Sequence, residues 1–257
     1  MQARFENKVV VVTGGAQGIG RAAAVRFASE GARIVVVDLR GSDLAGCIGA
    51  IEQAGGQAIA VEADVTVRAD VEAYVAAAIA KFGGIDFFFN NAGILGVVRP
   101  LLEYPEEIFD RVFAVNVKAV WLGMKLVAPA IIRRGGGAIV NTASIGGLRA
   151  SPGLLAYTAS KHAVIGMTRT GSIELVRQGV RVNAVCPAPI DTPMGKQLDE
   201  GFGPQDPEAA HARFISRIPM GRYGSPEEVA ALVAFLCSAD ASYVNGGIYT
   251  VDGGAMA

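Results

Sequence analysis

Lys8-Val9-Val10-Val11-Val12-Thr13-Gly14-Gly15-Ala16-Gln17-Gly18-Ile19-Gly20 is the stretch that decides the fold of this chain. Its first half is a run of valines, which is typical of a strand buried on both faces of a parallel sheet. Its second half is a glycine-rich turn, and the helix expected from about Ile19 would direct its free N–H groups at a pyrophosphate. The stretch therefore predicts a dinucleotide-binding turn, with a purely structural loop as the alternative.

The next predicted strand, residues 33–38, ends in the carboxylate of Asp38, 18 residues after Gly20. An acidic side chain near this distance meets the ribose hydroxyls of a bound dinucleotide. The 2′-phosphate of NADP would bring about two negative charges to the same place, so Asp38 favours NAD. Arg40 could offset part of this repulsion, and Asp38 could equally serve only as a cap of the following loop.

Strands and helices alternate along the rest of the chain. Hydrophobic periodicity and turn residues predict strands at 57–61, 85–89, 138–143, 181–185 and 248–251, and helices at 42–54, 68–82, 106–134, from about 153, and at 226–237. This alternation indicates one α/β domain over residues 1–257. We expect a Rossmann-type, doubly wound parallel sheet with helices on both faces, and, with the family resemblance described below, seven strands in the order 3-2-1-4-5-6-7.

Polar residues follow several of these strands. Asp64-Val65 come after the third strand, Asn90-Asn91-Ala92-Gly93 after the fourth and Ser144 after the fifth. Ligands of open α/β sheets bind outside the carboxyl ends of the strands, so these groups should converge on one crevice with the glycine-rich turn. Asp64 could also be the N-cap of the next helix, and both roles can hold together.

Tyr157-Thr158-Ala159-Ser160-Lys161 has the spacing of a proton-transfer pair. Residues four apart lie on the same face of a helix, so Tyr157 and Lys161 would point at a common spot. A fixed ammonium stabilises a phenolate, which lets the tyrosine give or take a proton at working pH. Asn116 stands out in mid-helix between two valines, where its amide either finds partners or distorts its own helix.

At these residues the chain resembles the classical short-chain dehydrogenases/reductases. The matching pieces come in the family's order and spacing over essentially the whole chain: Thr13-Gly14-x-x-x-Gly18-x-Gly20, Asp64, Asn90-Asn91-Ala92-Gly93, Asn116, Ser144, Tyr157-x-x-x-Lys161 and Val251-Asp252-Gly253-Gly254. The resemblance implies that Tyr157 is the acid/base and that Ser144 holds the substrate oxygen. It also implies that Lys161 lowers the Tyr157 pKa and bonds the nicotinamide ribose, while Asn116 supports a water between Lys161 and solvent.

Residues and resemblance together predict an NAD-dependent oxidoreductase that transfers a hydride between nicotinamide and a secondary alcohol or ketone. Leu39 and Gln17, where NADP users of the family commonly place a basic residue, are uncharged. The expected cofactor contacts are Gly14, Gln17, Gly18, Ile19, Gly20, Asp38, Leu39, Asp64, Val65, Asn90, Asn91, Ala92, Gly93, Tyr157, Lys161, Pro187, Ile190 and Thr192.

Two alternatives stay open. One is a carrier-protein-linked 3-oxoacyl reductase, which is usually NADP-dependent and usually has basic surface residues that grip the carrier. Asp38 counts against the first of these expectations, and the arginines at 99, 133 and 134 are too few to decide the second. The other is a catalytically silent nucleotide-binding regulator, against which the intact Ser144, Tyr157 and Lys161 argue.

The loop after the sixth strand departs from the family. Pro187-Ala188-Pro189 stands where Pro-Gly is usual, so Ala188 is expected to stiffen or redirect the loop beside the nicotinamide. The segment 192–219 combines Gly, Pro, Met and charge with little periodicity. It is predicted to be a substrate lid, with an inert surface loop as the alternative.

The expected substrate contacts are largely apolar. They are Ser144, Tyr157, Ala188, Leu95, Ile145 and Leu154, with Ile94 and Leu155 nearby. They favour a neutral and largely apolar substrate. Arg149 is the exception, because it could meet a carboxylate, although an exposed arginine at the rim is the simpler interpretation.

Composition argues against several other classes of protein. Lys and Arg number 23 against 24 Asp and Glu, which gives a net charge of −1 and no reason to expect nucleic acid or an anionic membrane as a partner. Three cysteines at scattered positions favour buried thiols in a reducing compartment and no metal. The first seven residues lack a signal-peptide core, and no apolar run approaches the ~18 residues of a membrane span. We therefore expect a cytoplasmic protein.

Two helical stretches predict self-association. Residues 109–130 and 163–176 carry more apolar positions than one core-facing stripe requires, so part of each should be buried between subunits. With the resemblance, this predicts a homotetramer with two-fold axes.

Overall fold

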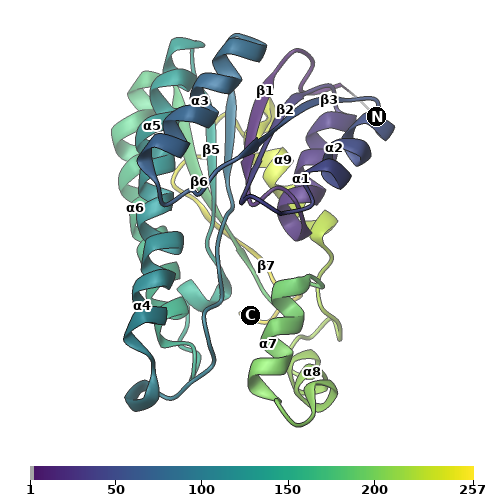
Figure 1. The fold of residues 1–257 in the computed structure, drawn as a ribbon, viewed down its shortest axis with the longest axis vertical. Helices are drawn as coiled ribbons and strands as arrows, with labels where there is room; N and C mark the ends of the chain where they lie inside the picture. Colours follow the sequence, from purple (N-terminus) through teal and green to yellow (C-terminus); the bar gives the residue numbers. More distant parts are fainter. Residues whose placement is uncertain (1–2) are drawn as a thin grey trace.

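Runs of β-branched and aromatic residues form one parallel sheet of seven strands in the computed structural model, which describes residues 3–257 (Figure 1). The strands are β1 (Val9–Thr13), β2 (Arg33–Asp38), β3 (Gln57–Glu62), β4 (Phe87–Asn90), β5 (Gly137–Thr142), β6 (Val180–Pro187) and β7 (Ile248–Val251). Their order is β3-β2-β1-β4-β5-β6-β7, which confirms the predicted topology. Residues 1 and 2, part of the stretch in which no signal peptide is expected, lie outside the described residues.

Helices cover both faces of the sheet (Figure 1). On one side lie α1 (Gly18–Ser29), α2 (Leu44–Gln53) and α9 (Pro226–Cys237), and on the other lie α3 (Arg68–Phe82), α5 (Ala119–Arg133) and α6 (Leu155–Leu175). Each face of the sheet packs against its helices in a separate hydrophobic core. Val10 and Val12 belong to the core on the side of α1, whereas Val9 and Val11 belong to the core on the side of α3. All four are fully buried, because successive side chains of a strand point to opposite faces and both faces are covered. This explains why the strand is a continuous valine run.

The helix predicted over 106–134 is interrupted. It consists of α4 (Glu106–Phe113), a π-helical turn η2 (Ala114–Lys118) and α5, and fully buried Asn116 sits in the middle of the wide turn. By length and composition alone, Glu106–Arg133 is long and apolar enough to cross a membrane. The core helices of soluble proteins pass the same test, and more than half of the apolar 18-residue window in this stretch is buried inside the fold.

The segment after β6 holds two helices that low periodicity does not predict. They are α7 (Pro193–Phe202) and α8 (Pro207–Ile215), and they lie beyond the end of the sheet (Figure 1). Thr192 caps α7 by accepting from the Gly195 N–H, and Asp206 caps α8 by accepting from the Ala209 N–H. A cap followed by proline is a helix-start signal that Thr192-Pro193 and Asp206-Pro207 both carry, as does Ser225-Pro226 at α9.

Short 3₁₀ turns complete the chain. They are η1 (Leu101–Glu103), η3 (Ile145–Gly147), η4 (Val176–Gln178) and η5 (Ala239–Ala241). The three cysteines, Cys47, Cys186 and Cys237, are free and buried, as the sequence predicts.

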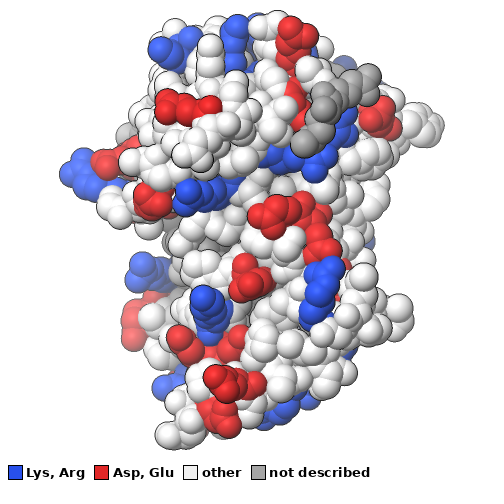
Figure 2. All heavy atoms as spheres, turned by 90° about the vertical axis from the view of Figure 1, so that its right-hand side faces the viewer, with Lys and Arg blue, Asp and Glu red and all other residues white. Residues whose placement is uncertain are grey.

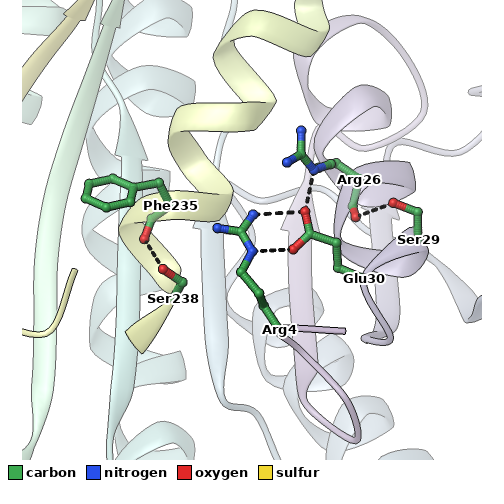
Figure 3. A network of polar contacts seen from close by, with 6 residues as sticks. All are labelled: Arg4, Arg26, Ser29, Glu30, Phe235 and Ser238. Atoms are coloured by element: carbon green, nitrogen blue, oxygen red, sulfur yellow. Dashed lines mark hydrogen bonds and ion pairs between the residues drawn. The ribbon is translucent and has the colours of Figure 1, made fainter. Parts of the chain in front are cut away.

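A buried carboxylate anchors the N-terminal segment to α1 (Figure 3). Glu30 is 2% exposed and accepts hydrogen bonds from Arg4 Nε and Nη2 at 2.5 and 2.9 Å and from Arg26 Nε at 2.5 Å. Burial acts to raise the pKa of Glu30, but the bonds from Arg4 and Arg26 outweigh it, so the pKa lies below its usual value. The carboxylate therefore has a structural role, because it joins the segment before β1 to α1.

The surface on the right-hand side of Figure 1, which includes α1, α2, α7 and α8, mixes both charges. Figure 2 shows Lys and Arg interspersed with Asp and Glu over this face, which holds no broad area of a single sign. This pattern agrees with the net charge of −1.

Candidate active site

A cavity of about 760 Å³ lies at the carboxyl ends of the strands. The glycine-rich turn and Asp38 form one end, and Ser144, Tyr157 and Lys161 face the other. Most of the predicted contacts line it: Gly14, Gln17, Gly18, Ile19, Asp38, Leu39, Asp64, Val65, Asn91, Ala92, Gly93, Leu95, Ser144, Ile145, Leu154, Tyr157, Lys161, Pro187, Ala188, Ile190 and Thr192. The chain thus brings its candidate cofactor and substrate residues into one space.

The glycine-rich turn fits a pyrophosphate. Gly14 and Gly18 have φ of 62° and 53°, a left-handed conformation that strains other residues. A Cβ on Gly18 would lie 3.2 Å from Thr192, so the turn passes close to the start of α7. Helix α1 begins here without a side-chain cap, which leaves its first N–H groups available to an anion in the cavity.

Two predicted cofactor contacts do not line the cavity. A Cβ on Gly20 would lie 2.0 Å from the Gly14 carbonyl oxygen, so Gly20 lets α1 approach the turn from behind. Asn90 Nδ2 donates to Val120 O at 3.0 Å and to Asn141 Oδ1 at 3.1 Å, which ties β4 to β5 and α5. Both residues support the site without facing it, because one is a packing glycine and the other points into the core.

Asp38 is held rigidly at the end of β2. One carboxylate oxygen accepts from Ala16 N at 2.9 Å, and the other accepts from Leu39 N at 2.8 Å and Ser42 Oγ at 3.0 Å. The residue therefore caps its loop and also lines the cavity, and its contact with a bound ribose stays a prediction. Arg40 pairs with Glu62 at 3.1 Å, is 90% exposed along its side chain and does not line the cavity.

Asp64 closes a turn and is not the N-cap of α3. Its Oδ1 accepts from Thr66 N at 2.9 Å and from Thr66 Oγ1 at 2.7 Å, whereas the N-cap position is Val67. This local turn presents Asp64 and Val65 to the cavity.

Asn116 links the loop after β4 to α6, the helix that carries Tyr157 and Lys161. Its Oδ1 accepts from Ile94 N at 2.9 Å, and its Nδ2 donates to Ile94 O at 2.9 Å and Ser160 Oγ at 3.1 Å. Ser160 in turn donates to the Tyr157 carbonyl at 2.7 Å. The buried amide is thus satisfied by other elements, while its own helix widens into a π turn around it. Asn116 does not line the cavity.

Tyr157 and Lys161 share one face of α6. Lys161 is 3% exposed, its Nζ donates to Thr142 O at 2.8 Å, and burial lowers its pKa to about 8. The same Nζ lies 5.6 Å from the centroid of the Tyr157 ring. Burial raises the pKa of Tyr157, and the neighbouring Ser144 hydroxyl opposes that shift. The net shift of the Tyr157 pKa is therefore upward in this structure, because desolvation is its largest cause.

The Pro187-Ala188-Pro189 loop is held on both sides. Ala188 N donates to Val251 O at 3.0 Å, and Pro189 O accepts from Gly224 N at 3.1 Å. Among residues 3–257, Asn7 is the one non-glycine with positive φ, so Ala188 adopts an ordinary conformation. Both hydrogen bonds are made by backbone atoms, so the stiffening by Ala188 stays a prediction.

The wall opposite the strand ends is apolar. Four apolar residues of the segment 192–219, which the sequence predicts as a lid without singling out its members, line the cavity: Met194, Leu198, Phe214 and Ile218. Leu155 is 40% exposed and does not line the cavity, because it starts α6 on the outer face. Arg149 lies at the rim, where Nη1 donates to Ala255 O at 3.2 Å, and Arg111 and Arg217 also reach the cavity.

Known proteins share this arrangement. A family model described as Enoyl-(Acyl carrier protein) reductase matches residues 14–256. Levodione reductase from Leifsonia aquatica is 43% identical over 99% of this chain and 96% of its own, and a crystal structure of levodione reductase matches with a TM-score of 0.95 at 43% identity over 98% of each chain. Cyclohexanol dehydrogenase from Acinetobacter sp. (strain SE19) is 41% identical over 98% of this chain and 96% of its own. A crystal structure of NAD⁺-bound xylitol dehydrogenase, 34% identical, has a TM-score of 0.94 over 97% of this chain and 99% of that chain. This chain therefore belongs to the short-chain dehydrogenase/reductase family and is an oxidoreductase.

Proposed function

We propose that the protein is an NAD-dependent dehydrogenase that interconverts a secondary alcohol and its ketone. The observation that carries the proposal is one cavity that joins the glycine-rich turn and Asp38 to Ser144, Tyr157 and Lys161. The similarity to levodione reductase, cyclohexanol dehydrogenase and xylitol dehydrogenase supports this reaction class.

The side chains divide the work of proton transfer. The glycine-rich turn and Asp38 would hold NAD, which would supply the hydride acceptor for the carbinol carbon. Tyr157 takes the hydroxyl proton during oxidation and gives it back during reduction, while Ser144 hydrogen-bonds the reacting oxygen. Because burial raises the pKa of Tyr157, the phenol is the resting form at neutral pH, which suits proton donation to a ketone. Oxidation requires the phenolate and should accelerate as pH rises.

The choice of NAD rests on Asp38. At ~4 Å and an effective dielectric near 20, each unit pair of like charges costs roughly 4 kcal/mol before screening, enough for a preference of several hundredfold. Arg40 pairs with Glu62 in this structure and does not line the cavity, so it is not turned toward the place of a 2′-phosphate. Steady-state kinetics with both cofactors tests this, and equal or better use of NADP by the natural protein would remove the assigned role of Asp38.

The proposed substrate is neutral and largely apolar around the reacting carbon. Leu95, Ile145 and Leu154 on one side and Leu198 and Phe214 on the other surround the space next to Tyr157. NADH production should be screened against cyclic, aromatic and aliphatic secondary alcohols. A response confined to acids, and lost on Arg149→Ala, would contradict a neutral substrate.

A carrier-linked acyl reductase is the second candidate. Its support is the similarity to a 3-oxoacyl-[acyl-carrier-protein] reductase of Thermotoga maritima, which is 40% identical over 98% of this chain and 99% of its own. A 3-oxoacyl thioester added to the same screen, with both reduced cofactors, separates the two: faster turnover of the thioester than of any simple ketone would favour the carrier-linked enzyme. Tight NAD binding without turnover of any compound would instead indicate a regulator.

We also propose a homotetramer. Trp121 on α5 and Ile173 on α6 are 46% and 75% exposed, and Val176 just beyond α6 is 43% exposed, so apolar surface remains on the two helical stretches that predict association. Light scattering at micromolar concentration should give four times the subunit mass, and a monomer there would contradict the proposal.

A further inference from the structure

Three side chains from three segments meet behind the wall of the cavity. Asp199 lies on α7, His211 on α8 and Tyr223 on the segment before α9. Tyr223 Oη donates to Asp199 Oδ1 at 2.5 Å, and His211 Nδ1 lies 2.9 Å from Asp199 Oδ2. The rings of His211 and Tyr223 pack with centroids 4.3 Å apart. We call these three residues the lid cluster.

Burial makes the lid cluster costly to break. Asp199 and Tyr223 are 7% and 8% exposed, and each carboxylate oxygen of Asp199 has its own partner. A buried carboxylate that loses a hydrogen-bond donor carries the full cost of its desolvation. Burial and the Asp199 carboxylate both raise the pKa of Tyr223, so its hydroxyl remains a donor at any working pH.

The lid cluster holds the elements that carry the apolar wall. Leu198 directly precedes Asp199, and Phe214 lies one turn after His211 on α8. Next to Tyr223, Gly224 exchanges backbone hydrogen bonds with Pro189 and Asp191, donating at 3.1 Å and accepting at 2.9 Å. The cluster therefore fixes both lid helices against the loop that borders Tyr157, although none of its members lines the cavity.

We propose that Asp199, His211 and Tyr223 are positioning residues that set the shape of the substrate wall and thereby select which alcohols the enzyme accepts. This inference rests on the proposed function, in that it takes α7 and α8 to be the wall against which the alcohol binds. The wall residues touch the substrate, and the cluster acts through them.

Tyr223→Phe is the sharpest test, because it deletes one oxygen and leaves the ring in place. KM for the alcohol should rise about tenfold, the loss expected for a hydrogen bond to a charged group, while kcat changes less and KM for NAD stays within about twofold. The ratio of kcat/KM between a small and a bulky alcohol should change as well. Asp199→Asn should act in the same direction. The matched controls are Tyr243→Phe, at a fully exposed tyrosine, and Glu200→Gln, at the exposed residue beside Asp199.

A second readout needs no substrate. Trypsin can cut after Lys196, Arg213 and Arg217 in the segment of α7 and α8. Because Tyr223→Phe and Asp199→Asn each weaken the lid cluster, both variants should be cut there about tenfold faster than the natural protein. If the natural enzyme is active, a Tyr223→Phe variant with wild-type alcohol KM and the same preference between alcohols overturns the inference. If the natural protein binds NADH but oxidises no alcohol, the proposed function fails, and unchanged lid cleavage in the two variants then overturns the cluster separately.

Discussion

The two ends of the cavity are built by different means. At the cofactor end, the lining residues directly follow strands whose positions are set by main-chain pairing, and Asn91 adds side-chain bonds to Thr13, Gly14 and Thr142 across three strands. At the substrate end, the wall comes from α7 and α8, which no strand pairing fixes and which depend on side-chain contacts such as Phe202 against Phe214. The sheet therefore gives a rigid dinucleotide site, while the wall can differ without disturbing the fold.

The largest effect is expected where the two ends meet, at Tyr157. Tyr157→Phe removes the proton carrier and keeps the ring, so turnover should fall by about three orders of magnitude or more while NAD still binds. Steady-state rates and cofactor binding by fluorescence measure the two quantities, with Tyr243→Phe as the exposed control. A variant that keeps more than about a tenth of wild-type turnover, a loss under ~1.4 kcal/mol, would show that Tyr157 is not the proton carrier.

The next effect concerns the cofactor end alone. Asp38→Asn keeps an oxygen for the Ala16 N–H but removes the charge, so the proposed several-hundredfold preference for NAD should shrink by about two orders of magnitude. KM for the alcohol should stay near the natural value, because the change lies at the other end. The ratios of kcat/KM with NAD and NADP for both proteins decide the matter. If the ratio of kcat/KM with NAD to kcat/KM with NADP did not change, Asp38 would not determine the choice of cofactor.

The pH dependence of the reaction rates tests the role of Tyr157 in proton transfer. Alcohol oxidation needs the Tyr157 phenolate, and the raised pKa means that its fraction grows about tenfold per pH unit through neutral pH. The rate of oxidation should thus rise from pH 6 to 9, whereas ketone reduction, which uses the phenol, should not. Lys161→Ala removes a positive charge 5.6 Å from the ring centroid and should move the profile to higher pH. An oxidation rate that falls over this range would contradict the assignment.

The smallest effect is expected for a single apolar side chain of the substrate wall, and it tests whether the two ends of the cavity bind their ligands independently. Leu198→Ala shortens one apolar side chain of the wall, so KM for a fitting alcohol should rise by about tenfold or less. KM for NAD should not change, since Leu198 lies on α7, away from Asp38 and the glycine-rich turn. Equal changes in both constants would mean that the two ends are not independent.

The same contrast explains what the sequence could predict. Strand runs and the residues that follow them set the seven-stranded topology and place Gly14, Asp38, Asn91 and Ser144 around one cavity. These features are local in sequence, because each side chain sits at the end of its own strand. The order of the strands then brings them together.

What the sequence could not predict depends on contacts between distant segments. The π turn at Asn116 is stabilised by Ile94 and Ser160, 22 and 44 residues away. Gly20 matches the cofactor motif, yet its space is needed by the Gly14 carbonyl. Helices α7 and α8 carried a readable start signal, a capping residue followed by proline, but the pairing of Asp199 with Tyr223 follows only from the fold.

Hydride transfer itself gives the most direct test of the account. The protein would be incubated with NAD and an active secondary alcohol that carries deuterium on the carbinol carbon, and the reduced cofactor would be analysed by mass spectrometry. The account predicts that each molecule of NADH gains one deuterium, and that Tyr157→Phe forms it at about a thousandth of the natural rate or less. NADH that forms without the label would contradict direct transfer from the alcohol in this cavity.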